Sequence, residues 1–320
     1  MNSIKTKTIL EVSVDRLNEK GVFMAEQILN IFHNTLEEHK KFFYKTYTAP
    51  DFSFEIANIN GTIRFFFVVD EEYAEFLENQ IYAHYPNIEI HQVDDYIPKG
   101  KGFMGNLKLV KPYIFPIKIY TDFKEKSEKE SVDPFSSITS ALQKGGKNDI
   151  KLIQVRFSPI HDTIWKDPKK IAILTSSYPK WLQKAYLGRY ALAWKIGLFP
   201  IMMLIKLILL IVHPHEQTEE TGAKDKNDPI DKKLGGFGFS VGINIGCFGT
   251  DNVTSKVTIK EAVSSLNIFS ISGGNGFNLD SEVHEDIASE LIKRTGKNSI
   301  ILNSAELAGL VHLPTIYVQT

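Results

Sequence analysis

Hydrophobic and polar residues alternate along several short runs near the N-terminus, and each run predicts a half-buried strand. Between these runs, apolar residues recur at helical spacing. The predicted elements are strand 9–14, helix 22–36, strand 52–56, strand 63–69, helix 71–84 and strand 88–90. Asn60-Gly61 separates two of the strands and is a strong hairpin signal, because both central residues of a type I′ turn need a positive φ. The order β-α-β-β-α-β is that of a ferredoxin-like sandwich.

A similar pattern recurs further along the chain. Its predicted elements are strand 113–120, a helix that starts at Pro134 after the N-cap Asp133, strand 150–157, strand 237–245, helix 258–269 and strand 277–279. We therefore predict an α+β fold of two tandem ferredoxin-like domains. The second domain is interrupted by a long helical and apolar insertion.

These patterns set the predicted domain limits. The first domain covers 1–98, the second covers 99–161 and 234–280, the insertion covers 162–233, and a helix-strand tail covers 281–320. The tail is predicted to hold a helix on Val283, Ile287 and Leu291, a strand at 299–302 and a small helix from Ser304.

The strand predicted at 237–245 has one bulky and one nearly bare face. Phenylalanine, valine and isoleucine alternate along it with Gly238, Ser240, Gly242 and Asn244. A face without side chains lets another segment pack closely against it. Glycines inside a strand cannot converge their amides on a phosphate, so we interpret this stretch as a packing surface.

The most apolar run, Leu198–Val212, lies inside the insertion and is broken only by Lys206. The basic and aromatic stretch before it has the composition of a bilayer interface. We predict lipid contact through 181–213. The predicted membrane contacts are Trp181, Tyr190, Trp194, Lys195, Leu198, Phe199, Met202, Leu204, Lys206, Leu207 and Leu210.

Topology argues against a single membrane crossing by this run. The flanking strands, 150–157 and 237–245, are predicted to share one sheet, and one crossing would separate them. The run is therefore expected to lie in one leaflet, with Pro200 as a kink and Lys206 reaching back to the interface. The alternative is a helix buried within the protein or at the interface of a homo-oligomer. The polar stretch 213–233 is the expected return linker.

Candidate chemistry is sparse. No P-loop motif occurs, the histidines are scattered apart from His213 and His215, and the single cysteine, Cys247, lies in an apolar strand pattern that predicts a buried, inert thiol. We predict no cofactor, no metal site and no enzymatic activity in this chain. The net charge of −1, and a lone Arg64 among the strand aromatics, argue against direct nucleic-acid binding.

Several segments resemble, in order, one known group of proteins. They are Ile9–Val14, Ala25–Ile28, Phe52–Ile56 with Asn60-Gly61, Asn79–Pro86, Asp133–Phe135, Ile153–Arg156, Ile301–Ala308 and His312–Pro314. These segments resemble the N-terminal region of conjugative-type ATPase proteins of small-genome bacteria. In that group the region precedes a HerA/FtsK-like motor related to type IV secretion ATPases.

The resemblance implies a membrane-docking and assembly role without ATP hydrolysis. Members of the group usually have an N-terminal transmembrane helix, whereas few residues here precede the first predicted strand, and the chain ends where the motor would begin. The implied partner is a separately encoded HerA/FtsK-like ATPase. The residues expected to dock the motor are Leu302, Asn303, Glu306, Leu307, His312 and Pro314.

Two functional hypotheses follow. The first is a non-catalytic accessory subunit of a type IV secretion or conjugation-like ATPase, peripheral or monotopic on the cytoplasmic face of the cell membrane. The second is a soluble, cytoplasmic, oligomeric module that binds protein or nucleic acid, with the apolar helix buried at an interface.

Overall fold

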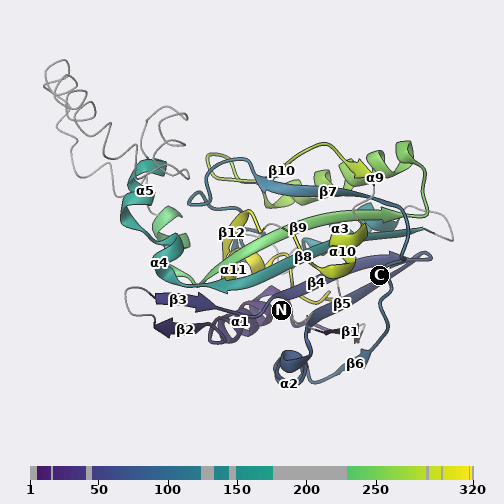
Figure 1. The fold of residues 1–320 in the computed structure, drawn as a ribbon, viewed down its shortest axis with the longest axis horizontal. Coiled ribbons are helices and arrows are strands. Elements are labelled where there is room, and N and C mark those ends of the chain that lie inside the picture. The colour runs from purple at the N-terminus through teal and green to yellow at the C-terminus, as the bar shows by residue number, and fades with distance from the viewer. Residues whose placement is uncertain are drawn as a thin grey trace, which may run out of the picture.

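The dominant feature of the fold is one large antiparallel sheet with helices packed against it (Figure 1). The computed structural model describes residues 6–15, 17–40, 45–123, 133–143, 149–175, 229–285, 288–296, 298–316 and 318. Within these ranges the chain has a mixed α+β fold, as the sequence predicts at this level.

The first half of the chain contains six strands. Its elements are β1 (Lys7–Val14), α1 (Val22–His33), β2 (Glu37–Lys40), β3 (Lys45–Thr48), β4 (Phe52–Ile59), β5 (Thr62–Asp70), the 3-10 turn η1 (Glu71–Tyr73), α2 (Ala74–His84) and β6 (Ile88–Gln92). The predicted hairpin between β4 and β5 is confirmed, because Asn60 and Gly61 have φ values of 55° and 90° and Ile59 pairs with Thr62.

The second half follows the same alternation with a longer tail. It contains β7 (Gly102–Leu109), η2 (Tyr120–Phe123), α3 (Phe135–Gln143), β8 (Ile150–Ile160), α4 (Asp162–Trp165), α5 (Pro168–Thr175), β9 (Gly238–Phe248), α9 (Asn252–Ser265), η3 (Leu266–Phe269), β10 (Phe277–Leu279), β11 (His284–Glu285), α10 (Ala288–Lys293), β12 (Ile300–Asn303) and α11 (Ser304–Ala308). Residues 229–235 are also helical.

Apart from β2 and β3, which pair only with each other, the strands of both halves join edge to edge in one sheet. Their order is β10-β7-β9-β8-β4-β5-β1-β6, with β11 paired to β7 and β12 paired to β9. The seam between the halves is the antiparallel pairing of β4 with β8, from Phe52 opposite Phe157 to Ile59 opposite Ile150. The two halves therefore share a backbone hydrogen-bond ladder.

The strand predicted at 113–120 is wrong. The first strand of the second half is β7, at Gly102–Leu109, and 113–119 forms turns and irregular chain. Pro112 and Pro116 explain this, because a proline cannot donate to a ladder inside a sheet. Of the alternating apolar residues Phe115, Ile117 and Ile119, only Ile117 is buried, so the alternation indicates neither strand geometry nor a buried face here. In the tail, Val283 precedes β11 and lies outside the predicted helix, which begins only at Ala288.

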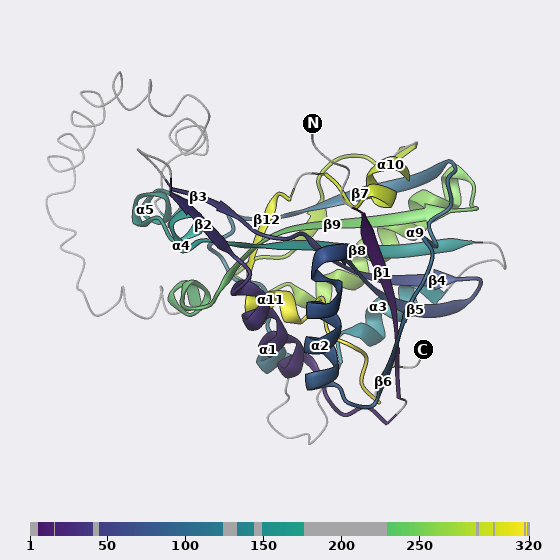
Figure 2. The ribbon, with the colours of Figure 1, turned by 60° about the horizontal axis from the view of Figure 1, so that its bottom comes forward.

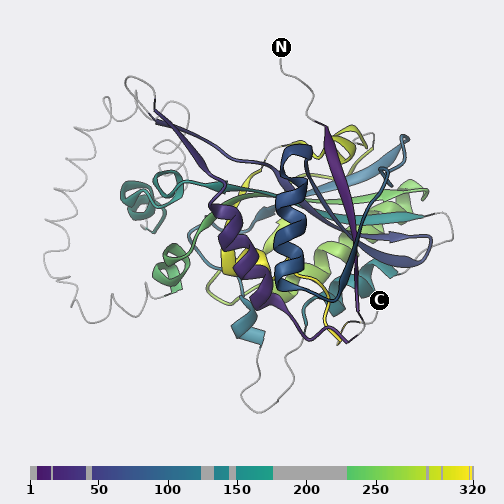
Figure 3. The same ribbon diagram turned by 90° about the horizontal axis from the view of Figure 1, so that it is seen from below.

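The sheet has a thick core on one face and a thinner one on the other. Helices α1, α2, α3, α9 and α11 lie on one face, while α10 lies on the opposite face (Figures 2 and 3). The larger core contains Phe32, Phe54, Phe135 and Phe239 among many others. The smaller core includes Phe66, Leu152 and Leu291 and is closed by Ile97 from the segment after β6.

The bare face of β9 is used for close packing, as the sequence predicts. A Cβ atom added at Gly238 would lie 2.3 Å from Nε1 of Trp165, and one at Gly246 would lie 2.7 Å from Cδ1 of Leu291. The glycines thus admit Trp165 at the first residue of β9 and Leu291 of α10 near its other end, directly against the backbone of the strand.

We predict that Gly238→Ala destabilises the protein by about 1–3 kcal/mol, because the rigid indole of Trp165 cannot yield the space that a methyl group needs. The free energy of unfolding in urea measures this. Gly100→Ala is the matched control, since a Cβ there meets nothing within 4 Å, and it should change stability by less than about 0.5 kcal/mol. Equal stability of the two variants would contradict the prediction.

Candidate functional site

The most distinctive feature of the fold is the place where residues 161–237 leave and rejoin the sheet. Strand β8 ends at Ile160 and β9 begins at Gly238, and these two residues are direct antiparallel partners. We call residues 160–161 and 237–238 the neck, and residues 161–237 the excursion. Because both sides of the neck lie on adjacent strands, the excursion starts and finishes at one point of the body.

Two histidine–aromatic stacks hold the neck. His33, at the end of α1, has its Nε2 3.2 Å from the carbonyl oxygen of Ile160 and its ring 4.6 Å from that of Phe237. Burial lowers the pKa of His33, so the ring is neutral at physiological pH and its Nε2–H donates to the carbonyl. Tyr47 of β3 stacks on His161, with 4.0 Å between ring centroids and 9° between planes.

Trp165 anchors the first residues of the excursion, 161–165, to the body. Its side chain is fully buried against Gly238, and the Tyr113 hydroxyl donates to its carbonyl oxygen at 2.7 Å. Lys166 Nζ lies 5.1 Å from the centre of the indole. The indole Nε1–H finds no hydrogen-bond partner among the described residues. This helical turn, α4, is therefore fixed by packing.

The returning side is held by a buried ion pair. Lys233 Nζ lies 2.9 Å from Glu306 Oε2, and both side chains are 1% exposed. Burial lowers the pKa of Lys233, and the Glu306 carboxylate opposes that shift. Glu306 also accepts hydrogen bonds from the backbone N–H groups of Ile117 and Asn303, while Asn303 donates to the Lys233 carbonyl. The return helix is thus fastened to α11.

The chain after α11 is fixed by a second buried polar cluster. His312 Nε2 lies 2.9 Å from Asp133 Oδ1, and the Thr315 hydroxyl donates to Asp133 Oδ2 at 2.7 Å. Burial alone would raise the pKa of Asp133, but His312 and hydrogen bonds from Phe135 and Thr315 outweigh it and set the pKa at about 2. Histidine and threonine both point at the carboxylate, so neither hydroxyl nor imidazole is arranged as a nucleophile–base pair.

The residues predicted to dock a motor all belong to these clusters or to the core. Leu302, Asn303, Glu306, Leu307, His312 and Pro314 are all buried. Asn303 and Glu306 form the capping box of α11, and His312 stacks on Phe135 at 3.8 Å. Their contacts are with this chain, and a docking role for them stays a prediction.

A third buried cluster lies on the opposite face of the sheet. Arg294, beyond α10, makes a two-point ion pair with Glu55 of β4 and also pairs with Asp95. Burial alone would lower the pKa of Arg294, but the two carboxylates raise it. Tyr96 and Gln154 complete the hydrogen bonds of Glu55. The cluster fastens α10 and the segment after β6 to the sheet.

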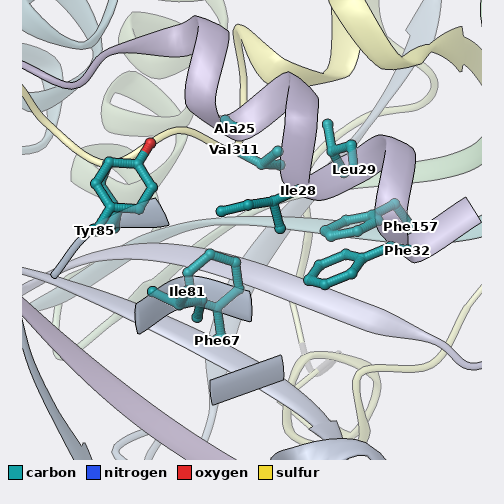
Figure 4. A pocket seen from close by; sticks show the side chains of 10 residues that line it. Ala25, Ile28, Leu29, Phe32, Phe67, Ile81, Tyr85, Phe157 and Val311 are labelled. Atoms are coloured by element: carbon teal, nitrogen blue, oxygen red, sulfur yellow. The ribbon is translucent and has the colours of Figure 1, made fainter. Parts of the chain in front are cut away.

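One cavity beneath α1 is small and apolar. It measures about 20 Å³ between α1, α2 and the sheet and is lined by side chains such as Ile28, Phe32 and Phe157 (Figure 4). Its one polar group, the Tyr85 hydroxyl, donates to the Gly21 carbonyl at 3.4 Å. A cavity of this size could hold one water but offers too few partners for it, so we interpret the cavity as a packing void.

The remaining groups considered for chemistry are the single cysteine and the possible metal ligands. Cys247 is buried, which confirms the predicted burial, and this burial raises the pKa of the thiol to about 12. In the described ranges, no three His, Cys, Asp or Glu side chains gather as metal ligands.

The predicted membrane contacts lie outside the described residues. They are Trp181, Tyr190, Trp194, Lys195, Leu198, Phe199, Met202, Leu204, Lys206, Leu207 and Leu210. Among the residues that the structure does describe, no helix combines the length and the apolar character needed to cross a bilayer.

The contacts at the neck carry little sequence signal. The strands β2 and β3 are short, polar and without alternation, so Tyr47 could not be placed beside the neck. Lys233 lies in a charged stretch that is typical of a linker. A run of apolar residues after Lys233 would have indicated a buried cation. The residues that follow are Leu234 and two glycines, so this signal is absent.

The sequence matches the model of one protein family, a domain of unknown function (DUF8128), over residues 5–320. The chain belongs to this family. A comparison with curated proteins gives no match.

We predict that Glu306→Gln and Lys233→Met each destabilise the protein by about 3–5 kcal/mol, because each leaves its partner buried without a counter-charge. The double variant should cost clearly less than the sum, which a double-mutant cycle in urea measures. The exposed pair Lys108–Asp280 is the control, and Lys108→Met or Asp280→Asn should cost less than about 1 kcal/mol. Additive effects at Lys233 and Glu306 would contradict the prediction.

We also predict a stability loss in acid that depends on Asp133. Its folded pKa of about 2 lies below the unfolded value of 3.8, so the carboxylate stabilises the fold above about pH 4 and this contribution disappears as the pH falls through 2. The difference corresponds to about 2 kcal/mol. Urea unfolding of wild type and Asp133→Asn at stepped pH should show the step only in wild type. Asp94→Asn, at an exposed carboxylate, should retain the step.

Proposed function

We propose that the protein is a non-catalytic, membrane-associated docking subunit of a translocation ATPase of the type IV secretion or conjugation kind. The ATPase would be a separately encoded HerA/FtsK-like motor. Support comes from the order of the segments that resemble such proteins, from the apolar run Leu198–Val212 inside the excursion, and from the geometry of the neck.

The neck carries the proposal. Ile160 and Gly238 are direct partners, so any membrane-bound part of the excursion must begin and end on the same side of a bilayer. A single crossing does not meet this condition, whereas an apolar helix lying in one leaflet does. Lipid contact through 181–213 is compatible with this closed path. The histidine stacks, Trp165 and Lys233 would then hold the body at a fixed position relative to the membrane surface.

The strand order also supports the finer description of the fold. In the first half, the order of the strands in the main sheet is β6-β1-β5-β4. Numbered along the chain without β2 and β3, these are its fourth, first, third and second strands. In the second half the order is β10-β7-β9-β8, which is again fourth, first, third and second. This is the order of a ferredoxin-like unit. We propose that the body is two such units fused through β4 and β8, a rigid platform suited to docking.

We predict that replacing 195–213 by a glycine-serine segment of equal length abolishes flotation with lipid vesicles and leaves unfolding in urea unchanged. The reason is that β8 and β9 pair along their full length up to the neck, and that the fastening residues Trp165 and Lys233 lie outside the replaced segment. Vesicle flotation and urea unfolding of both proteins are the measurements. Unfolding of the variant, or dissociation of an oligomer, would instead indicate that the run is buried at an interface.

The partner is tested separately. Full-length protein, purified with the HerA/FtsK-like ATPase encoded in the same genome, should retain that ATPase through size-exclusion chromatography. If the two proteins elute separately while vesicle binding is intact, the docking role is contradicted and the membrane association still stands.

A further inference from the structure

Strand β6, Ile88–Gln92, is the last strand at one end of the main sheet. It pairs with β1 along one side, and no strand of the described residues lies along its other side. Natural proteins usually protect such an edge with a very short strand, a lysine, a proline or a bulge. The opposite end of the sheet has this protection, because β10 has three residues and β11 has two. β6 has five residues and contains neither lysine nor proline, so its edge is open to a further strand.

The pairing with β1 decides which backbone groups of β6 point outward. Val93 donates its N–H to the carbonyl of Ile9, directly after the last residue of β6. In an antiparallel ladder, residues that exchange hydrogen bonds in this way recur at every second position. Glu89 and His91 therefore direct their N–H and C=O groups toward β1.

The other side of β1 gives the same result. Glu71 of η1 donates its N–H to the carbonyl of Thr6, so the even-numbered residues of β1 exchange hydrogen bonds with β5 and the odd-numbered ones with β6. The N–H and C=O groups of Ile88, Ile90 and Gln92 consequently point away from the sheet. Each of these residues offers one donor and one acceptor to a further strand.

The side chains of β6 form an apolar row and a charged row. Ile88 and Ile90 face the helices, belong to the larger core and are each 8% exposed. Glu89 and His91 are exposed on the other face, with 3.7 Å between Oε2 and Nε2. A strand that adds to this edge therefore meets isoleucine on one face and a carboxylate beside an imidazole on the other.

The β6 strand of a second copy is complementary to this edge. If the two strands pair antiparallel about a two-fold axis at Ile90, Ile88 faces the partner's Gln92 and Glu89 faces the partner's His91. Every outward N–H group then meets an outward carbonyl group. Glu89 and the partner's His91 form a pair without mutual backbone hydrogen bonds, in which cross-strand side chains lie closest, and the two-fold axis produces this pair twice.

Other registers are less complementary. Moving the axis by one residue toward either end of β6 places Glu89 opposite the partner's Glu89, or His91 opposite the partner's His91. Like side chains directly opposite each other repel when charged, whereas a carboxylate and an imidazole attract. The charge pattern of β6 therefore selects the axis at Ile90.

The edge lies apart from the neck. In Figures 1 and 2, β6 and α2 lie at one end of the body, whereas α4 and α5, which follow the neck, lie at another. Pairing at β6 is therefore independent of the membrane role proposed for the excursion.

We propose that β6 is a self-association edge, at which a second copy of this chain continues the main sheet across a two-fold axis at Ile90. The two sheets join through backbone hydrogen bonds, as in other cases of strand addition. Because the axis is perpendicular to the sheet, the helices of both copies lie on the same face of the joined sheet. Five residues per copy make a small interface, so we expect a dissociation constant in the micromolar range.

Gln92→Pro tests the backbone pairing. The side chain of Gln92 is exposed and its N–H points outward, so proline removes a donor from the edge without removing a hydrogen bond to β1. Sedimentation velocity of the full-length protein, at concentrations from below to well above micromolar, should show a monomer–dimer equilibrium for wild type. Loss of one donor in each copy should raise the dissociation constant about 30-fold. Gln92→Thr keeps the N–H, is the matched control and should dimerise as wild type does, and urea unfolding checks that both variants are folded.

A charge exchange tests the position of the axis. His91→Glu places two carboxylates opposite each other at both symmetric positions and should raise the dissociation constant about tenfold. Glu89→His/His91→Glu exchanges the two side chains, so a carboxylate again faces an imidazole, and it should restore the wild-type value. A dissociation constant that stays raised in the exchanged variant would overturn the axis at Ile90.

Two further results would overturn the proposal as a whole. One is a wild type that remains monomeric throughout the concentration range. The other is a dimer of equal strength in wild type and Gln92→Pro, which would place the contact elsewhere, such as at the apolar run Leu198–Val212. A monomeric wild type that retains the motor ATPase, and loses it in Gln92→Pro, would assign the edge to a strand of that protein and likewise overturn self-association.

Discussion

The pairing of β8 with β9 is the constraint on which the rest of the structure depends. These two 11-residue strands are in register from Ile150–Phe248 to Ile160–Gly238. One outer edge of the pair joins the first half through β4, and the other carries β7 and β12. The end of the pair forms the neck, so the β8–β9 ladder closes a long interruption of the chain, while the other edge of β8 forms the seam with β4.

Local chemistry made part of this fold predictable. Asn60-Gly61 specifies its turn without help from distant residues, and the alternation of glycine along β9 reported a face with no room for side chains. Alternation at 113–120 was misleading, because Pro112 and Pro116 remove ladder donors and only Ile117 of the alternating residues is buried. The β2–β3 pair and the buried ion pairs could not be predicted, since Glu55 and Arg294 are brought together only by the completed sheet.

Buried charge is concentrated where separate segments must meet. Lys233–Glu306 joins the return of the excursion to α11, Asp133–His312 joins α3 to the chain beyond α11, and Arg294–Glu55 joins the segment after α10 to the sheet. Such pairs add little net stability compared with apolar residues of equal size, but an unmatched partner is costly. We interpret them as specificity elements that admit one arrangement of the tail. The residues that resemble a motor-proximal segment are thereby integral to the body.

The state of Cys247 has a practical chemical consequence. It is the single thiol of the chain, and because burial raises its pKa to about 12, the thiolate is scarce at pH 8, even before burial restricts access. Maleimides and thiol-specific spin labels react with thiolates, so we expect Cys247 to remain unlabelled in the unmodified protein. A cysteine introduced at any exposed position would be the sole reactive thiol, and probes of depth, distance or accessibility could be attached without first removing a native residue.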